Sequence, residues 1–172
     1  MPPRKSRASE TDRPASTERR ADSASAYLDG LKLLARRELS EAQVRDRLAR
    51  RNHDQSTVDE AISRLTAERA VDDGRLAEVI ARAEIRRRHG PQKALHRMER
   101  AGLERALARQ AVAKAFAAVD ERALIEAALD RRLRGARSIA DQGDLRRLYR
   151  FLVGQGFEGD LAMRALKARS VK

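Results

Sequence analysis

The sequence contains no cysteine and no tryptophan, and its aromatic side chains are only two tyrosines and three phenylalanines. Without cysteine the chain cannot form disulfides, zinc–thiolate sites or a thiol nucleophile. Apolar residues make up 41% of the chain, but with so few large rings they fill a small core more readily than a large one. We therefore predict small helical bundles in preference to one large globule.

Motifs of the common enzyme classes are also absent. There is no phosphate-binding Gly-x4-Gly-Lys-Ser/Thr loop, and there is no nucleophile elbow centred on a serine. Of the three histidines, His89 and His96 are separated by the helix-breaking pair Gly90–Pro91, and His53 lies far from both. The pair Asp72-Asp73 could supply two catalytic carboxylates, but it directly precedes a helical pattern, where aspartate commonly caps free amides. We predict a protein that is not an enzyme and binds no metal or cofactor.

Basic residues dominate the charge of the chain. Lys and Arg number 38 against 26 Asp and Glu, which gives a net charge of +12. Such an excess favours an anionic partner, and we expect weak, sequence-tolerant binding to single- and double-stranded DNA. The alternative is a solvated surface that reflects an arginine-rich genome.

No apolar run approaches the ~18 residues of a membrane span, and the opening residues, Met1 to Lys5, lack the apolar segment of a signal peptide. We expect a cytoplasmic protein without membrane contact. Residues 1–22 combine proline, serine, threonine and both charge signs without an apolar period. They predict a disordered basic tail, which either contacts nucleic acid or is dispensable.

From residue 24 onward the apolar residues follow a helical period, as Val58, Ala61, Ile62 and Leu65 illustrate. The predicted helices are 24–37, 40–51, 57–70, 73–89, 91–101, 104–119, 121–134, 144–154 and 160–169, and no segment is predicted as a strand. Helix starts are marked by capping-box patterns at Ser40 and Thr57, by Asp72, and by Gly90 followed by Pro91.

One turn pattern recurs three times. Asn52, Gly102 and Gly156 each follow a helix and each precede, by ten positions, an apolar residue of the next helix. Glycine and asparagine favour the left-handed conformation that ends helices, so all three should have positive φ. The recurrence predicts three helical repeats, over 23–71, 72–119 and 120–172, which share contacts where they adjoin.

These segments resemble proteins of the RecX family. Arg36–Leu48 is similar to the family's Arg-x-x-Ser-x-x-Glu-Leu-x-x-Lys-Leu opening, with Gln43 and Val44 in place of Glu-Leu. Val71–Ala77 is similar to Leu-Asp-Asp-x-Arg-Phe-Ala, and Ala101–Leu103 to the close of Leu-x-x-x-Gly-Ile. Phe151–Phe157 matches Phe-Leu-x-x-Arg-Gly-Phe, with glutamine at 155 where arginine is usual. The resemblance covers roughly residues 26–168.

The resemblance implies an all-α fold of three tandem three-helix repeats in an elongated, curved arrangement. It also implies a regulator of DNA repair, recombination and the SOS response that binds the RecA–DNA filament. Such a protein inhibits filament growth and the ATPase, strand-exchange and coprotease activities of RecA, and we expect it to be a monomer. The alternative is a stand-alone DNA-binding regulator of helix-turn-helix type, for which three equivalent repeats would be unusual.

Clusters of arginine are the candidate contacts with RecA or DNA, because the guanidinium group binds phosphates and carboxylates with two parallel hydrogen bonds. The alternative is that part of each cluster is only a solvated surface. The candidates are Arg86, Arg87, Arg88, Lys93, Arg97, Arg100, Arg131, Arg132, Arg134, Arg137, Arg146, Arg147 and Arg150.

Overall fold

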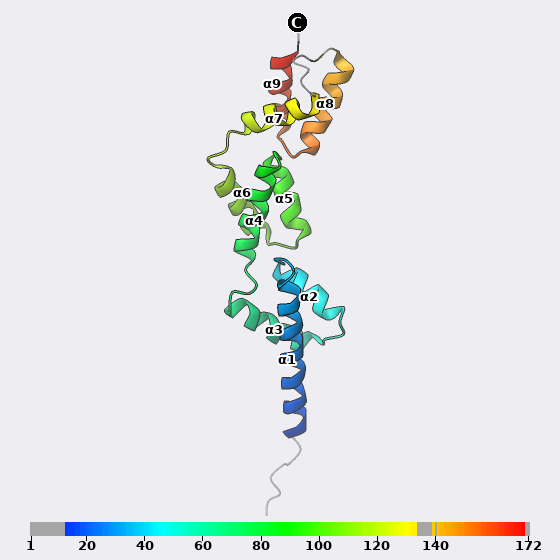
Figure 1. The fold of residues 1–172 in the computed structure, drawn as a ribbon, viewed down its shortest axis with the longest axis vertical. Coiled ribbons are helices and arrows are strands. Elements are labelled where there is room, and N and C mark those ends of the chain that lie inside the picture. Colours follow the sequence, from blue (N-terminus) through cyan, green and yellow to red (C-terminus); the bar gives the residue numbers. More distant parts are fainter. Residues whose placement is uncertain (1–12, 134–138, 140, 171–172) are drawn as a thin grey trace, which may run out of the picture. The chain divides into compact units, whose positions relative to one another are not determined.

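The computed structural model describes residues 13–133, 139 and 141–170, and over these residues it contains nine α-helices (Figure 1). The one β-type contact in this part of the chain is an isolated bridge between Ile139 and Ser170. The all-α prediction is therefore confirmed. The chain divides into two compact units, Met1–Asp72 and Asp73–Lys172.

The first unit is a three-helix bundle of α1 (Arg13–Leu34), α2 (Glu41–Ala49) and α3 (Gln55–Ala67). Its core includes Ala26, Val44, Leu48, Ile62 and Leu65, all of them 2% exposed or less. Helix α1 begins at Arg13, so residues 13–22 of the predicted tail are helical. Residues 1–12 of that predicted tail lie outside the described residues.

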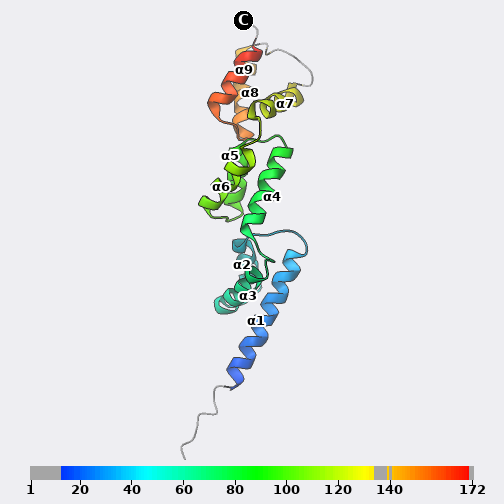
Figure 2. The ribbon, with the colours of Figure 1, turned by 90° about the vertical axis from the view of Figure 1, so that its left-hand side faces the viewer.

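The second unit contains two three-helix bundles (Figure 2). The first is α4 (Asp73–Arg86), α5 (Pro91–Arg100) and α6 (Arg105–Phe116), and the second is α7 (Glu121–Leu133), α8 (Gln142–Gly154) and α9 (Gly159–Arg169). Each bundle has its own core, which includes the fully buried Met98 in one and the fully buried Leu152 in the other. Leu124 packs against both cores, so the two bundles are joined through this residue.

The predicted helix starts are confirmed at Ser40 and Pro91. The Ser40 hydroxyl oxygen accepts a hydrogen bond from the Gln43 amide at 3.1 Å, and Pro91 is the first residue of α5. Asp72 directly precedes α4, where its capping role stays a prediction.

The prediction that Thr57 caps a helix is wrong, because α3 begins two residues earlier, at Gln55. The cap is Asp54, whose carboxylate accepts hydrogen bonds from the Thr57 amide at 3.0 Å and from the Thr57 hydroxyl at 2.7 Å. Thr57 is itself 1% exposed. A carboxylate at the positive end of the helix is a stronger acceptor than a hydroxyl, which explains why the cap lies at the earlier position.

The recurring turn has the predicted conformation, with φ of 64° at Asn52, 77° at Gly102 and 88° at Gly156. In each copy the amide of the next residue donates to a carbonyl five residues back, as from Phe157 to Leu152 at 3.2 Å. This is the Schellman pattern of helix termination. Arg69 and Arg88 end α3 and α4 in the same way, with φ of 55° and 62°.

The turn that ends α8 also caps α5. Gly90, which precedes α5, has no side chain to satisfy the first amides of that helix. Instead, the Gly90 amide donates to the Gln155 carbonyl at 2.9 Å and the Gln92 amide donates to the Gly156 carbonyl at 3.1 Å. This junction of α5 with the turn that ends α8 is termed the seam.

Both glycines of the seam are required by close approach of the main chains. A Cβ at Gly90 would lie 2.3 Å from the Gly156 carbonyl oxygen, and a Cβ at Gly156 would lie 2.3 Å from the Lys93 amide nitrogen. Gly90 has φ of −79°, so its role is this approach and not a left-handed turn.

Because of these contacts, the same Gly→Ala substitution should destabilise the protein to different extents in two of the glycine turns. Gly102→Ala should cost about 1 kcal/mol, because Gly102 is exposed and has a positive φ that disfavours a Cβ. Gly156→Ala should cost about 2–4 kcal/mol, because steric overlap at the seam adds to the strain. Urea unfolding followed by circular dichroism measures both losses, and equal losses would contradict the seam as described.

Candidate functional site

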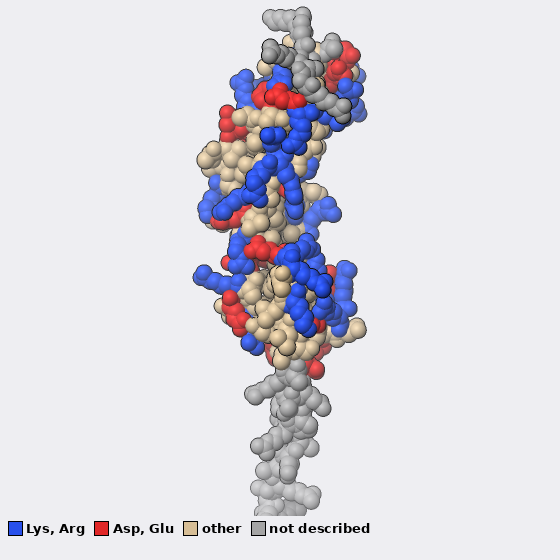
Figure 3. All heavy atoms as spheres, in the orientation of Figure 1, with Lys and Arg blue, Asp and Glu red and all other residues tan. Residues whose placement is uncertain are grey.

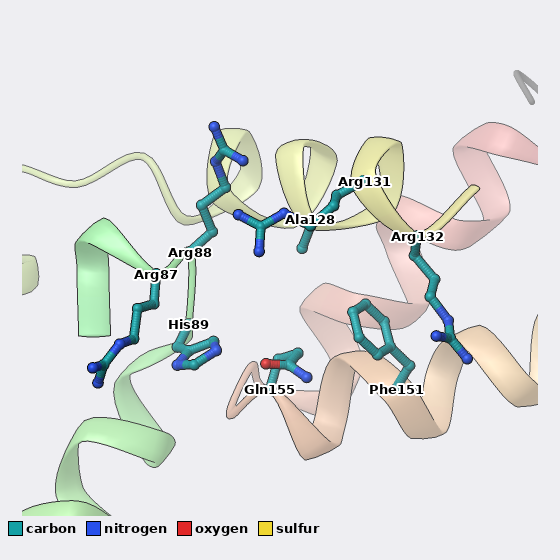
Figure 4. A pocket seen from close by; sticks show the side chains of 8 residues that line it. All are labelled: Arg87, Arg88, His89, Ala128, Arg131, Arg132, Phe151 and Gln155. Atoms are coloured by element: carbon teal, nitrogen blue, oxygen red, sulfur yellow. The ribbon is translucent and has the colours of Figure 1, made fainter. Parts of the chain in front are cut away.

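A cavity of about 380 Å³ opens in the second unit beside the seam (Figure 4). The turn that follows α4 forms one wall, α7 forms another, and α8 with the turn that ends it forms a third. The lining consists of Arg87, Arg88, His89, Ala128, Arg131, Arg132, Phe151 and Gln155. Four of these residues are arginines and none is a carboxylate, so the cavity is strongly positive. Figure 3 shows Lys and Arg side chains over much of the visible surface of this unit.

The four arginines differ in how far their charge is compensated. Arg87 pairs with Glu84 at 2.9 Å, and its guanidinium points away from the other arginines in Figure 4. Arg88 extends toward α7, which carries Arg131 and Arg132. Over the described residues, no ion pair involves Arg88, Arg131 or Arg132. Three cations without a counterion therefore face one recess, an arrangement that attracts an anion.

Phe151 provides an apolar wall in the middle of the cavity. The Arg132 guanidinium lies 5.4 Å from the centre of the Phe151 ring, within the range of a cation–π contact. Phe151 packs on the α7–α9 core but is only partly buried, so part of its ring belongs to the cavity. Gln155 lies beside it in Figure 4, and the side-chain oxygen of Gln155 accepts a hydrogen bond from Lys93 at 3.1 Å.

A buried carboxylate holds the α4 wall in place. The Glu84 side chain is 3% exposed and contacts Arg87, Arg97 at 2.5 Å and the His89 ring at 2.5 Å. Burial by itself would raise the pKa of Glu84, but the hydrogen bonds from His89, Arg97 and Arg87 outweigh it and the pKa is lowered. Glu84 therefore stays ionised and fixes the loop that presents Arg88 and His89 to the cavity.

The structure brings together only some of the predicted contact residues. Arg87, Arg88, Arg131 and Arg132 share the cavity. Arg97, Lys93 and Arg147 bind partners within the chain, namely Glu84, Gln155 and Asp144. The exposed residues outside the cavity lining are Arg86, Arg100, Arg146 and Arg150. Arg134 and Arg137 lie outside the described residues. A role in binding a partner stays a prediction for all of them.

Sequence reasoning did not find four residues of the site: Glu84, His89, Phe151 and Gln155. Glu84 and His89 adjoin the arginine cluster of residues 86–88, but nothing in their spacing distinguishes a buried ion pair from an exposed one. Gln155 carried a signal, since it stands where the RecX pattern has arginine. Among the described residues, no helix is long and apolar enough to cross a membrane, and no group of side chains could hold a metal ion.

Known proteins resemble this chain over most of its length. The family model for the first three-helix domain of RecX matches residues 26–65. The regulatory protein RecX of Halorhodospira halophila is 33% identical over 138 residues, which cover 80% of this chain and 84% of that protein. The RecX protein of Acidithiobacillus ferrooxidans is also 33% identical, over 80% of this chain and 86% of its own length. This chain belongs to the RecX family.

Solved RecX structures share the fold. The crystal structure of RecX from Lactobacillus salivarius superposes with a TM-score of 0.69 at 17% identity, covering 86% of this chain and 96% of that one. A second crystal structure of regulatory protein RecX gives a TM-score of 0.74 at 17% identity, with coverage of 96% and 81%. The predicted RecX resemblance and the fold of tandem three-helix repeats are thereby confirmed.

The ionised state of Glu84 predicts how a variant responds to pH. Glu84→Gln should lower the free energy of unfolding by about 1.5–3 kcal/mol at pH 7, because it removes hydrogen bonds to a buried charge. A lowered pKa stabilises the fold above the ordinary value of 4.5, and this contribution is lost as pH falls toward the folded-state pKa. The gap between wild type and variant should therefore narrow as pH falls from 7 to below the ordinary value of 4.5. Urea midpoints across this range test it, and a constant gap would contradict an ionised Glu84.

Proposed function

We propose that this chain regulates RecA by binding the RecA–DNA filament and inhibiting its growth. Reduced ATPase, strand-exchange and coprotease activities of RecA follow from this inhibition. The observation that carries the proposal is 33% identity, over 80% of the chain, to proteins named regulatory protein RecX. A RecA partner also accounts for the net charge of +12, because the filament contains DNA. It further implies a cytoplasmic protein.

The repeat architecture supports a mechanism of several small contacts. Each three-helix bundle has its own core and its own exposed surface. On a polymer of identical subunits, a chain with several weak contacts gains affinity, since each contact raises the effective concentration of the next. A monomer bound in this way at a filament end would block addition of the next RecA subunit.

The basic cavity supplies the candidate contact of the second unit. Its uncompensated arginines, Arg88, Arg131 and Arg132, fit phosphate groups of the DNA or carboxylates of RecA. Long-range attraction by these charges accelerates association with an anionic polymer and weakens with salt. The second candidate function is a stand-alone DNA-binding regulator, which the exposed arginines and short helices also fit.

The test is a titration of RecA ATPase and strand exchange with the wild-type chain and a charge-reversed variant. Substoichiometric wild type should slow both reactions. The triple variant Arg88→Glu, Arg131→Glu and Arg132→Glu should raise the half-inhibitory concentration at least about tenfold, because it replaces the attraction of the cavity for anions with repulsion.

The matched control is Arg109→Glu, Arg122→Glu and Arg164→Glu. These arginines are exposed on the same unit, lie outside the cavity lining and make the same change in net charge. The control should inhibit nearly as well as wild type. If wild type leaves RecA unaffected at equimolar concentration, the proposed function is wrong. If it sediments with bare DNA as well as with RecA filaments, the stand-alone regulator is favoured.

A further inference from the structure

We infer that the cavity beside the seam binds one nucleotide of single-stranded DNA, with its phosphate on Arg88 and Arg131 and its base against Phe151. The inference deepens the proposed function, on which it rests for the DNA of the filament. The site itself can be tested on bare DNA without RecA, so its failure is distinguishable from failure of that function.

The charge of the cavity provides the phosphate contact. Arg88 and Arg131 come from different bundles, line the same recess and have no ion pair over the described residues. Two guanidinium groups from different elements can contact one phosphate from two sides, each with its own pair of N–H donors. No carboxylate lines the recess to compete with the phosphate.

The aromatic wall provides the base contact. Phe151 points from α8 toward α7, on which the small side chain of Ala128 lines the same recess (Figure 4). The Arg132 guanidinium lies over this ring at 5.4 Å from its centre, so a base that contacts Phe151 would also be near a planar guanidinium group. Aromatic and guanidinium planes are the surfaces on which proteins stack unpaired bases.

Gln155 adds a hydrogen-bonding group at the base of the recess. Its side-chain oxygen is occupied by Lys93, which leaves the amide N–H groups as donors toward the cavity. An incoming nucleotide offers acceptors for these donors in its base carbonyls and its phosphate. The cavity therefore combines charged, aromatic and amide surfaces within one recess.

The combination favours an unpaired nucleotide over two other anions. Bases in a duplex are stacked and paired, so they cannot enter a recess without being extruded. An acidic peptide could pair with the arginines, but its carboxylates have no aromatic plane that could stack on Phe151. A volume of about 380 Å³ is at the lower end of small-ligand sites, which suits one nucleotide and not a longer segment.

The seam fixes this geometry before any ligand binds. His89 and Arg88 directly precede Gly90, whose amide donates to the carbonyl of Gln155 in the opposite wall. Main-chain hydrogen bonds therefore hold the α4 wall against the α8 wall. A preformed site loses little conformational entropy on binding.

The first experiment places a negative charge in the cavity without removing an arginine. Gln155→Glu keeps the size of the side chain and can still accept the hydrogen bond from Lys93. It should weaken binding of a fluorescent thymidine oligonucleotide by the full chain at least about tenfold in anisotropy titrations. The control Gln142→Glu makes the same change at an exposed position outside the cavity, and it should alter affinity less than about twofold. Equal effects of the two variants would overturn the site.

The second experiment distinguishes a nucleotide from any other anion. Wild type should bind the thymidine oligonucleotide about five- to one-hundredfold more tightly than an abasic oligonucleotide of equal length, because the abasic strand offers no base to stack. Phe151→Leu should lose most of this preference, because its affinity for the thymidine strand should fall much more than its affinity for the abasic strand. Circular dichroism confirms that each variant is folded.

The competing ligands are tested in the same assay. Duplex DNA and polyglutamate, at matched charge, should compete less well than the single strand for wild type. If polyglutamate competes as well as the oligonucleotide, or if wild type does not distinguish the abasic strand, the cavity is not a nucleotide site. In that event the RecA ATPase titration still decides the proposed function independently.

Discussion

The second unit depends on a main-chain contact between two helix ends. Helix α5 starts with Gly90 and Pro91, which offer no capping side chain, while the turn at Gly156 presents free carbonyls. Each end supplies what the other lacks, because the Gly90 and Gln92 amides donate to the Gln155 and Gly156 carbonyls. The contact needs no side chain at all, so it leaves the side chains of the neighbouring walls free for the cavity. Glycine at both positions is what permits the approach.

The distribution of charge follows from one buried carboxylate within this frame. Glu84 contacts both Arg87 and Arg97, so these two cations belong to the interior network and not to the free charge of the surface. Arg88 is adjacent in sequence but has the left-handed conformation that ends α4, which turns its side chain toward α7. Adjacent arginines therefore have different roles, and the net charge of the chain does not show which arginine is paired and which is not. Desolvating Glu84 is costly and is offset only because three donors surround it.

Local sequence patterns predicted the helices. Features that depend on contacts between residues far apart in the chain could not be predicted from those patterns. The glycine turns and the caps at Ser40 and Pro91 follow from properties of single residues. Thr57 failed because a stronger acceptor, Asp54, stands three residues before it. Left-handed arginines such as Arg88 carry no local signal, because arginine, unlike glycine or asparagine, does not favour a positive φ. The cavity joins residues far apart in the chain, as Lys93 and Gln155 are separated by 62 positions, and no periodicity encodes such a pair.

The repeat therefore explains the backbone of this protein but not its site. The residue before the left-handed position is Arg51, Ala101 or Gln155 in the three copies of the turn. Arg51 pairs with Asp29 on α1 at 2.9 Å, Ala101 is buried in the α4–α6 core, and Gln155 accepts Lys93 across the seam. The same turn geometry therefore serves three purposes. The side chain of the residue before the left-handed position decides whether the turn anchors a helix, completes a core or lines a cavity. Because the turn itself is satisfied by main-chain hydrogen bonds, that side chain can change without cost to the repeat, and the third copy can acquire a binding surface.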